Sequence, residues 1–312
     1  MPCLVWLPDP DGNAFWGEPA PTCVGGALGA SLLDGALVLT AGVLIIFLGS
    51  SIRWYLLDVR PRTPRTDRQW IEALRTQPTV RFDGSMATIH GVRDFSWHSS
   101  RSFDARWFDA SYDLEQITEI RYLVSEFSRF RGLAHTMLDF SFEDGRSLTF
   151  SFEVRCEVGE TYSPWKGLWR NYELILVIGT TEDVVRLRTN ASKGCVVRSY
   201  RAIPSAPGKA AALFRSLCER ANELSTNPVW YHSVKTTCTT AIIDEVNRVT
   251  PGRVPFTWRA YLPGYSARIA HRIGLIEDHG GLRSTMARSR IDGDLRGIDD
   301  REAWLERFYM LS

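Results

Sequence analysis

Residues 227–247 read NPVWYHSVKTTCTTAIIDEVN, and this stretch governs the interpretation of the whole chain. Thr236 and Thr237 are residue types that cap the start of a helix, and alanine, isoleucine and valine then recur at helical spacing. The pattern predicts a helix with Cys238 in its first turn. Free amides and the positive end of the helix dipole favour an anion there, which predicts a lowered thiol pKa. The alternative is a small buried apolar residue, so Cys238 is a candidate nucleophile that needs a base.

Composition and charge limit the classes of protein to which the chain can belong. The chain has 312 residues, 44% hydrophobic and 12% aromatic, which suffices for one large or two modest folded domains. Its formal net charge is +1 and the charges are mixed along the sequence, so it lacks the basic field that nucleic-acid binding requires. The six cysteines lie far apart without zinc-ligand spacing. We therefore predict no cofactor, no metal and no nucleic-acid partner, while the oligomeric state and any disulfide pairing stay open.

An uncharged run, GALVLTAGVLIIFLGSSI, precedes Arg53. As a helix, its 18 residues span roughly 27 Å, close to the hydrocarbon thickness of a bilayer. We predict an irregular segment at 1–34, a transmembrane helix at 35–57 and a linker at 58–77. A cleaved signal peptide fits less well, because no basic segment precedes the run. Arginines follow the helix, and by the positive-inside rule they favour a cytoplasmic position for the rest of the chain.

Residues 134–155, AHTMLDFSFEDGRSLTFSFEVR, predict a β-hairpin with one apolar and one mainly polar face. Aligning the apolar faces requires an odd loop, and EDG at 143–145 supplies three residues with glycine at the left-handed position. This register places His135 opposite Glu153 on the polar face. The two residues then form a base and a carboxylate that fixes its tautomer, as a Cys–His enzyme needs. A solvated His–Glu surface pair is the alternative.

The remaining segments complete the predicted domain. Short strands begin at about residue 78, and YELILVIG (172–179) and DVVRLRTN (183–190) are predicted as two further strands. The aromatic-rich loop at 159–171 is a candidate wall over a hydrophobic substrate, or else a cover for the core. An amphipathic helix at 208–224 carries Cys218 on its core side, and residues 286–312 are predicted to be a polar helical tail.

Several long, irregular motifs resemble the Lnb amino-terminal periplasmic domain family over roughly residues 66–285. They include ATIHGVRDF, AHTMLDFSFEDG, GETYSPWKGLWRNYEL, VVRLRTN, TTCTT and LPGYS. Domains of that family resemble circularly permuted NlpC/P60 or papain-like thiol enzymes, in which the His strand precedes the Cys helix. The resemblance implies an α+β, permuted papain-like (NlpC/P60-like) domain at 78–285, with an antiparallel sheet and packed helices, preceded by the amino-terminal transmembrane helix.

The family's namesake is a lipoprotein N-acyltransferase. The resemblance therefore implies a membrane-anchored, extracytoplasmic thiol acyltransferase or hydrolase with Cys238, His135 and Glu153 as catalytic residues and a phospholipid or lipoprotein as substrate. It also implies a single-pass inner-membrane protein with a periplasmic domain, which we prefer to the orientation that the arginines suggest. The chain departs from the family in two ways. Threonines at 236 and 237 replace the usual Asn-Asn, and the namesake carries further membrane spans after this domain.

Other functions stay open at this stage. The same residues would serve a papain-like peptidase or amidase acting on cell-wall peptides, and the domain could instead be a non-catalytic, membrane-tethered binding module. His232 is a reserve base, although its place before the capping threonines favours a role in the loop. A zinc site built from His135, His232 and Cys238 is a further alternative.

Overall fold

The computed structural model describes residues 25–130, 132–257 and 262–311, and it divides into two units, Met1–Arg62 and Thr63–Ser312. In the first unit, helix α1 (Gly25–Trp54) continues into a π-helical turn, η1 (Tyr55–Val59). The segment Gly35–Val59 is long and apolar enough to cross a membrane. The helix begins earlier than expected, because residues 25–34 are rich in helix-forming alanine and leucine. The prediction of an irregular segment was therefore wrong for these residues, and its remainder, 1–24, lies outside the described part of the chain.

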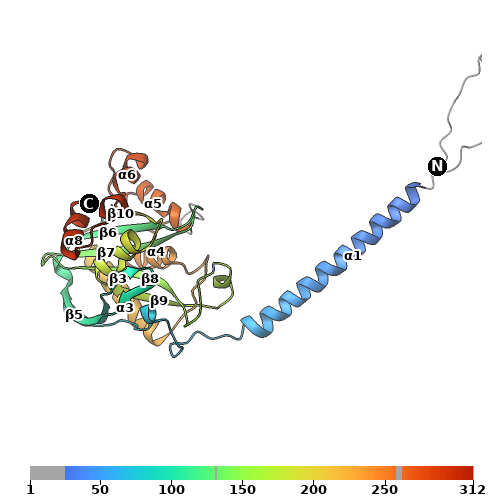
Figure 1. The fold of residues 1–312 in the computed structure, drawn as a ribbon, viewed down its shortest axis with the longest axis horizontal. Coiled ribbons are helices and arrows are strands. Elements are labelled where there is room, and N and C mark those ends of the chain that lie inside the picture. Colours follow the sequence, from blue (N-terminus) through green and yellow to red (C-terminus); the bar gives the residue numbers. More distant parts are fainter. Residues whose placement is uncertain (1–24, 131, 258–261, 312) are drawn as a thin grey trace, which may run out of the picture. The chain divides into compact units, whose positions relative to one another are not determined.

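The second unit is built on an eight-stranded sheet (Figure 1). Its strands in spatial order are β1 (Thr79–Asp83), β2 (Met86–Arg93), β9 (Glu173–Gly179), β8 (Ser147–Arg155), β7 (Ala134–Phe142), β6 (Ile117–Glu126) and β10 (Val196–Arg201), and β5 (Trp107–Asp113) also pairs with β2. A separate pair comprises β3 (Ser96–Ser99) and β4 (Ser102–Asp104). The sheet is antiparallel except where β2 meets β9, which pair in parallel. The expected antiparallel sheet is therefore a mixed one, because these two strands are not joined by a hairpin.

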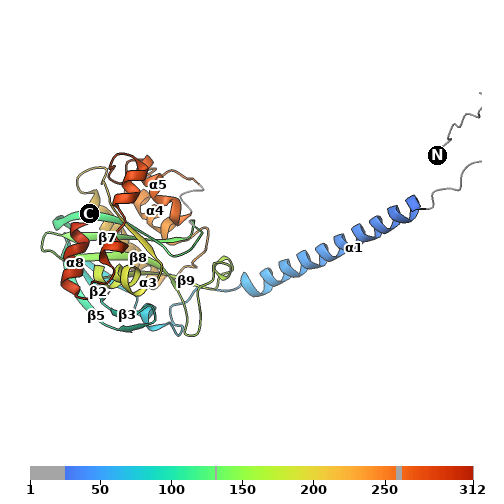
Figure 2. The same ribbon diagram turned by 45° about the horizontal axis from the view of Figure 1, so that its top comes forward.

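Helices cover both faces of this sheet (Figure 2). On one face, α3 (Lys209–Thr226), α4 (Cys238–Val249) and α5 (Pro263–Arg272) pack against a core that contains Phe140 and Phe150. On the other face, α2 (Thr181–Val184), α7 (Asp292–Leu295) and α8 (Arg301–Met310) surround Leu123 and Met137. The remaining helical segments are η2 (Glu72–Leu74), η3 (Leu114–Gln116), η4 (Lys166–Leu168), η5 (Leu187–Ala191) and α6 (Leu282–Arg288). The observed class is α+β.

The predicted hairpin register is confirmed. Leu138 pairs with Phe150, the Phe142 amide donates to the Arg146 carbonyl, and Gly145 takes the left-handed conformation (φ 81°). The second face is mainly polar as predicted, but it is covered, since Asp139 is fully buried there. The reason lies in the carboxy-terminal segment.

The described residues 286–311 contain the helices α7 and α8 and the end of α6, so they are largely helical as predicted, but they are not a polar tail. Trp304 and Phe308 of α8 are fully buried and stack with their ring centroids 5.4 Å apart. They cover the second face of the hairpin as part of one core cluster with Met137. The segment therefore belongs to the folded unit, because it supplies the apolar cover that a two-sided sheet needs.

Two other predictions were wrong in detail. The segment 183–190, predicted as a strand, forms the end of α2 and part of η5, because Thr180 caps a helix by accepting from the Asp183 amide. Residues 63–77, predicted as linker, lie within the second unit, where Trp70 is buried and forms a β-bridge with Glu157. The predictions for the helix at 208–224 and for a buried Cys218 are confirmed by α3, in which that cysteine is fully buried.

Candidate functional site

The start of α4 fixes the position of Cys238. Thr237 is the N-cap, and its Oγ1 accepts from the Thr240 amide at 3.2 Å. The Thr240 hydroxyl in turn accepts from the Thr237 amide at 2.7 Å, which completes a capping box. Cys238 is the first helical residue, so its amide and that of Thr239 have no acceptor within the helix. Thr239 also bonds to Thr136 of β7, 3.0 Å between hydroxyls, and this joins the helix start to the sheet.

His135 lies near the start of β7, where a polar chain orients its ring. The Ser151 hydroxyl donates to Glu153 Oε1 at 2.8 Å and therefore accepts from His135 Nε2, 2.7 Å away. Glu153 Oε1 is also 3.2 Å from Nε2 itself and accepts from Arg188 Nη2 at 2.7 Å. A proton on Nε2 leaves Nδ1 as the basic nitrogen of a neutral His135. The predicted partners His135 and Glu153 thus lie together, and Arg188 holds the carboxylate.

The Cys238 thiol and the His135 imidazole interact directly and shift each other's titration. Burial raises the pKa of Cys238, but the charge of His135 and hydrogen bonds from His135 and Thr136 outweigh it and bring the pKa to about 7. Burial lowers the pKa of His135, whereas Glu153 and Cys238 raise it to about 9. The pKa of Glu153 falls below its usual range, because His135 and Arg188 outweigh its burial. Between about pH 7 and pH 9 the site therefore holds a thiolate beside an imidazolium.

The environment of Cys238 differs from that of other described cysteines. Burial raises the pKa of Cys156 to about 11, and it raises that of Cys218 well above the ordinary value. Cys238 is 5% exposed and the His135 side chain 14% exposed, so the pair is largely buried but keeps a small exposed area. Low thiol pKa and residual access are the properties of a reactive cysteine rather than of a structural one.

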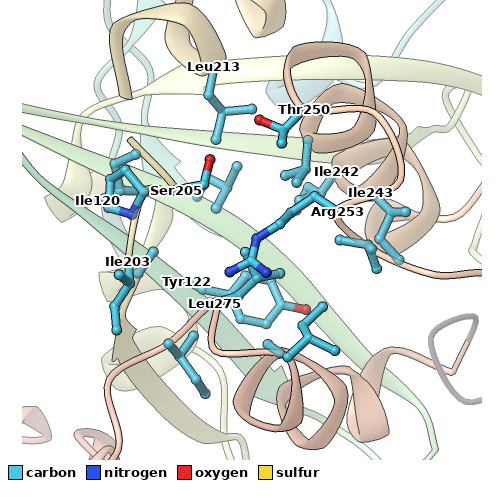
Figure 3. A pocket seen from close by; sticks show the side chains of 18 of the residues that line it. Ile120, Tyr122, Ile203, Ser205, Leu213, Ile242, Ile243, Thr250, Arg253 and Leu275 are labelled. Atoms are coloured by element: carbon cyan, nitrogen blue, oxygen red, sulfur yellow. The ribbon is translucent and has the colours of Figure 1, made fainter. Parts of the chain in front are cut away.

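An apolar pocket follows one side of α4, and Cys238 is not among the residues that line it (Figure 3). Thr239 lines one end, and its hydroxyl lies 3.9 Å from the Cys238 sulfur. Isoleucine and valine side chains of α4 and α5 and of the residue after α5 form part of the wall, at positions 242, 243, 246, 269 and 273. In Figure 3 the Arg253 side chain extends across the pocket, and its buried Nε has no hydrogen-bond partner. The pocket is suited to an aliphatic chain.

The other sequence candidates lie outside this arrangement. His232 Nδ1 accepts from the amides of Val234 and Lys235, each at 3.1 Å, so its ring shapes the loop before α4. Burial and the charge of Lys235 lower its pKa. Within the described residues, no three His, Cys, Asp or Glu side chains gather as metal ligands. The reserve base and the zinc alternative therefore gain no support from the geometry.

Sequence reasoning missed three residues of the site: Thr136, Ser151 and Arg188. Ser151 could have been predicted from the sequence, because it lies two residues before Glu153 and therefore on the same face of β8. Arg188 could not have been predicted, because its segment was assigned to a strand, whereas it lies on η5. The contact between Arg188 and Glu153 joins segments 35 residues apart.

Alkylation by iodoacetamide should report the lowered thiol pKa. We expect the rate at Cys238 to rise with pH to a plateau above about pH 7, because only the thiolate reacts. In His135→Gln the pH midpoint of the alkylation rate should move above the ordinary range of cysteine pKa values. Burial of Cys238 then raises the thiol pKa without the opposing positive charge of His135. At pH 6 a move of the thiol pKa from about 7 to above about 9 corresponds to a reaction at least roughly a hundredfold slower. Peptide mass spectrometry would measure the site-specific rates, and equal midpoints in the two proteins would contradict the pairing.

Comparison with known proteins identifies the second unit. The family model for the Lnb N-terminal periplasmic domain matches residues 103–264, just over half of the chain and a range that contains Cys238, His135 and Glu153. No curated protein and no solved structure matches the chain. The periplasmic family and the apolar helix α1 together fit a single-pass membrane protein with a periplasmic domain. By its sequence, this chain belongs to the Lnb N-terminal periplasmic domain family.

Proposed function

We propose that the protein is a thiol acyltransferase or hydrolase, anchored in the inner membrane by α1, which acts on lipid or lipoprotein acyl groups in the periplasm. The observation that carries the proposal is the connected set of Cys238, His135, Glu153 and Arg188, in which the thiol pKa is about 7 and the imidazole pKa about 9. A cysteine that only fills space in a core does not require a neighbouring charged histidine or a lowered pKa.

The chemistry proceeds through a thioester. The Cys238 thiolate attacks the ester carbonyl of a phospholipid, and the amides of Cys238 and Thr239 stabilise the oxyanion. The new C–S bond stays while the C–O bond to the leaving alcohol breaks, and the His135 imidazolium protonates that alcohol. An amine or water then attacks the thioester, His135 takes its proton, and the thiolate leaves. Glu153 keeps the imidazole oriented and stabilises its charged form.

The apolar pocket favours an acyl group over a peptide. Thr239, the residue after the reactive cysteine, lines this pocket, which continues along α4 between aliphatic side chains. A peptide backbone placed there would need partners for its amides and carbonyls, which such a wall does not provide. An acyl chain needs none. A peptidase or amidase that acts on cell-wall peptides is therefore the second candidate, supported by the shared Cys–His–Glu set alone.

The order of elements also agrees with the permuted papain-like arrangement that the sequence suggested. His135 lies on β7 and Cys238 on α4, which packs on β7 and β8 and follows them in the chain. We include residues 63–312 in the domain, because Trp70 at one end and Trp304 at the other are both buried in this unit.

Trapping of the intermediate tests this proposal. The full-length protein, reconstituted in liposomes that contain phospholipids with defined acyl chains, is quenched in acid and digested. We expect the peptide that contains Cys238 to carry one acyl chain and to lose it on treatment with neutral hydroxylamine, which cleaves thioesters. A peptidyl adduct after incubation with cell-wall peptides would favour the second candidate. An unmodified Cys238 under both conditions, together with slow alkylation at pH 6, would indicate a non-catalytic binding module.

A further inference from the structure

Exposed apolar side chains gather in the loops around the candidate site. The large exposed hydrophobic residues of the second unit include Phe127 and Phe130 before β7, Trp165 after β8, Val234 before α4 and Phe256 after it. Trp165 is 68% exposed and Phe256 86% exposed. Val158 and Tyr162 belong to the same loop as Trp165 and are also exposed. Side chains of this kind gain free energy by leaving water, so their clustering calls for a partner.

These loops form one surface, which we call the rim and define as the exposed side chains of residues 127–130, 158–166, 234–235 and 256. Ser233 joins two of the loops, since its amide donates to Gly167 at 3.1 Å and its hydroxyl to Pro164 at 2.7 Å. The Gly264 amide donates to Gly132 at 3.2 Å, which ties the turn before β7 to the segment that follows Phe256. Cys238 and His135 lie directly after two of these loops. In Figures 1 and 2 the loop after β8 and the turn before β7 project from the same side of the unit.

Basic side chains alternate with the apolar ones on the rim. Arg129, Lys166 and Lys235 are exposed, and each is next to an exposed hydrophobic residue in the sequence. Among the described residues none of the three has a carboxylate partner within ion-pair distance. Of the acidic residues close by, Glu126 pairs with Arg198 and Glu157 with Arg68, and Glu160 accepts from the Glu157 amide. With three cations against Glu160, the rim combines apolar contact area with a net positive charge.

We propose that the rim is a membrane-docking surface that inserts its apolar side chains into the interface of an anionic bilayer. Tryptophan, tyrosine and phenylalanine side chains favour the headgroup level of a membrane, and neighbouring Lys and Arg are attracted by anionic lipid. A protein partner would offer carboxylates to these cations but would not need apolar side chains on several separate loops. Docking places the site entrance against the lipid, so an acyl chain could reach Cys238 without crossing water.

The α1 helix makes this docking efficient. A domain tethered to the bilayer meets the membrane as an intramolecular event, so weak contacts from a few loop residues suffice. The inference rests on the proposed function only for the identity of the substrate. The docking itself requires no catalysis, and the two can be tested separately.

Site-specific fluorescence tests the docking. The full-length chain, with Cys3→Ser, Cys23→Ser and Cys238→Ala to remove background labelling, receives one new cysteine at Trp165 or Val234 for an NBD label. The remaining native cysteines, 156, 195 and 218, are buried. A matched control carries the label at Met310, an equally exposed hydrophobic residue (72%) on α8. Each protein is reconstituted in liposomes of phosphatidylcholine with or without phosphatidylglycerol.

We expect a blue-shifted emission and quenching by brominated lipid at the two rim positions, stronger with phosphatidylglycerol and weaker at high salt, because salt screens the attraction of Lys and Arg. The Met310 label should stay accessible to an aqueous quencher. Aqueous exposure of the rim labels in both compositions would overturn the proposal, and so would equal lipid quenching at Met310.

An activity measurement separates docking from chemistry. In a chain that retains Cys238, the combined substitution Phe130→Ser, Trp165→Ser and Val234→Ser should lower acyl release from liposome lipid at least about tenfold. Hydrolysis of a water-soluble short-chain thioester should stay within about twofold, since these side chains are exposed and outside the site. Equal losses on both substrates would contradict the docking role. Loss of all activity in the parent chain with intact lipid quenching would reject the proposed function alone.

Discussion

Cys238→Ala is expected to abolish acyl release from phospholipid, with a loss of at least about a thousandfold, because no other group can form the thioester. The measurement is the rate of fatty-acid or lysolipid formation by the full-length protein in liposomes. Cys156→Ala is a suitable control, since that thiol is also buried and burial raises its pKa to about 11. The control should retain nearly all activity. A Cys238→Ala protein with full activity would remove the basis of the mechanism.

The pH dependence of the same reaction follows from the two shifted groups. Activity requires the thiolate, which forms as pH rises through about 7, and the imidazolium, which is lost as pH rises through about 9. We therefore expect a bell-shaped profile with its plateau between these two pH values. In His135→Gln the rate should fall on the order of a hundredfold or more, and the upper limb should disappear. An unchanged profile in this variant would exclude His135 as the acid and base.

Some of this site follows from local sequence rules. The alternation in 134–155 and the glycine at 145 fix the hairpin register, because a shift by one residue would turn every side chain to the other face. That register is what brings His135 to Glu153, 3.2 Å apart. The threonines before Cys238 fix the helix start in the same way, through a capping box. These features depend on neighbours close in sequence or on a single turn.

Other features depend on parts of the chain that meet only in the folded protein. The burial of the second face of β7 and β8 could not be predicted, because the residues that cover it, Trp304 and Phe308, lie far along the chain. The run at 183–190 carries two valines and a threonine, which favour a strand, yet the Thr180 cap and packing against α7 and α8 give helical turns. Arg188 was missed because its contact with Glu153 exists only once η5 packs near β8 in the folded protein.

Replacement of Glu153 should reduce activity about as much as replacement of His135. Glu153 carries three contacts at one oxygen, to His135, Ser151 and Arg188, and it raises the pKa of His135. Glu153→Gln removes the charge that stabilises the imidazolium. We expect a loss of activity on the order of a hundredfold or more, with the upper pH limb moved to lower pH. The shift of this limb is a readout that damage to the fold alone would not produce.

Arg188→Ala should act through Glu153 and not independently of it. The variant leaves Ser151 and His135 in place to hold the carboxylate, so we expect a smaller loss of about tenfold in the wild-type background. In the Glu153→Gln background the same substitution should have little further effect, because the partner charge is already absent. Arg186→Ala is the matched control. Its guanidinium donates to the carbonyls of Ile298 and Asp299, away from His135, and its loss should affect stability without changing the pH profile. Additive losses in the double variant would show that Arg188 supports the fold rather than the carboxylate that orients His135.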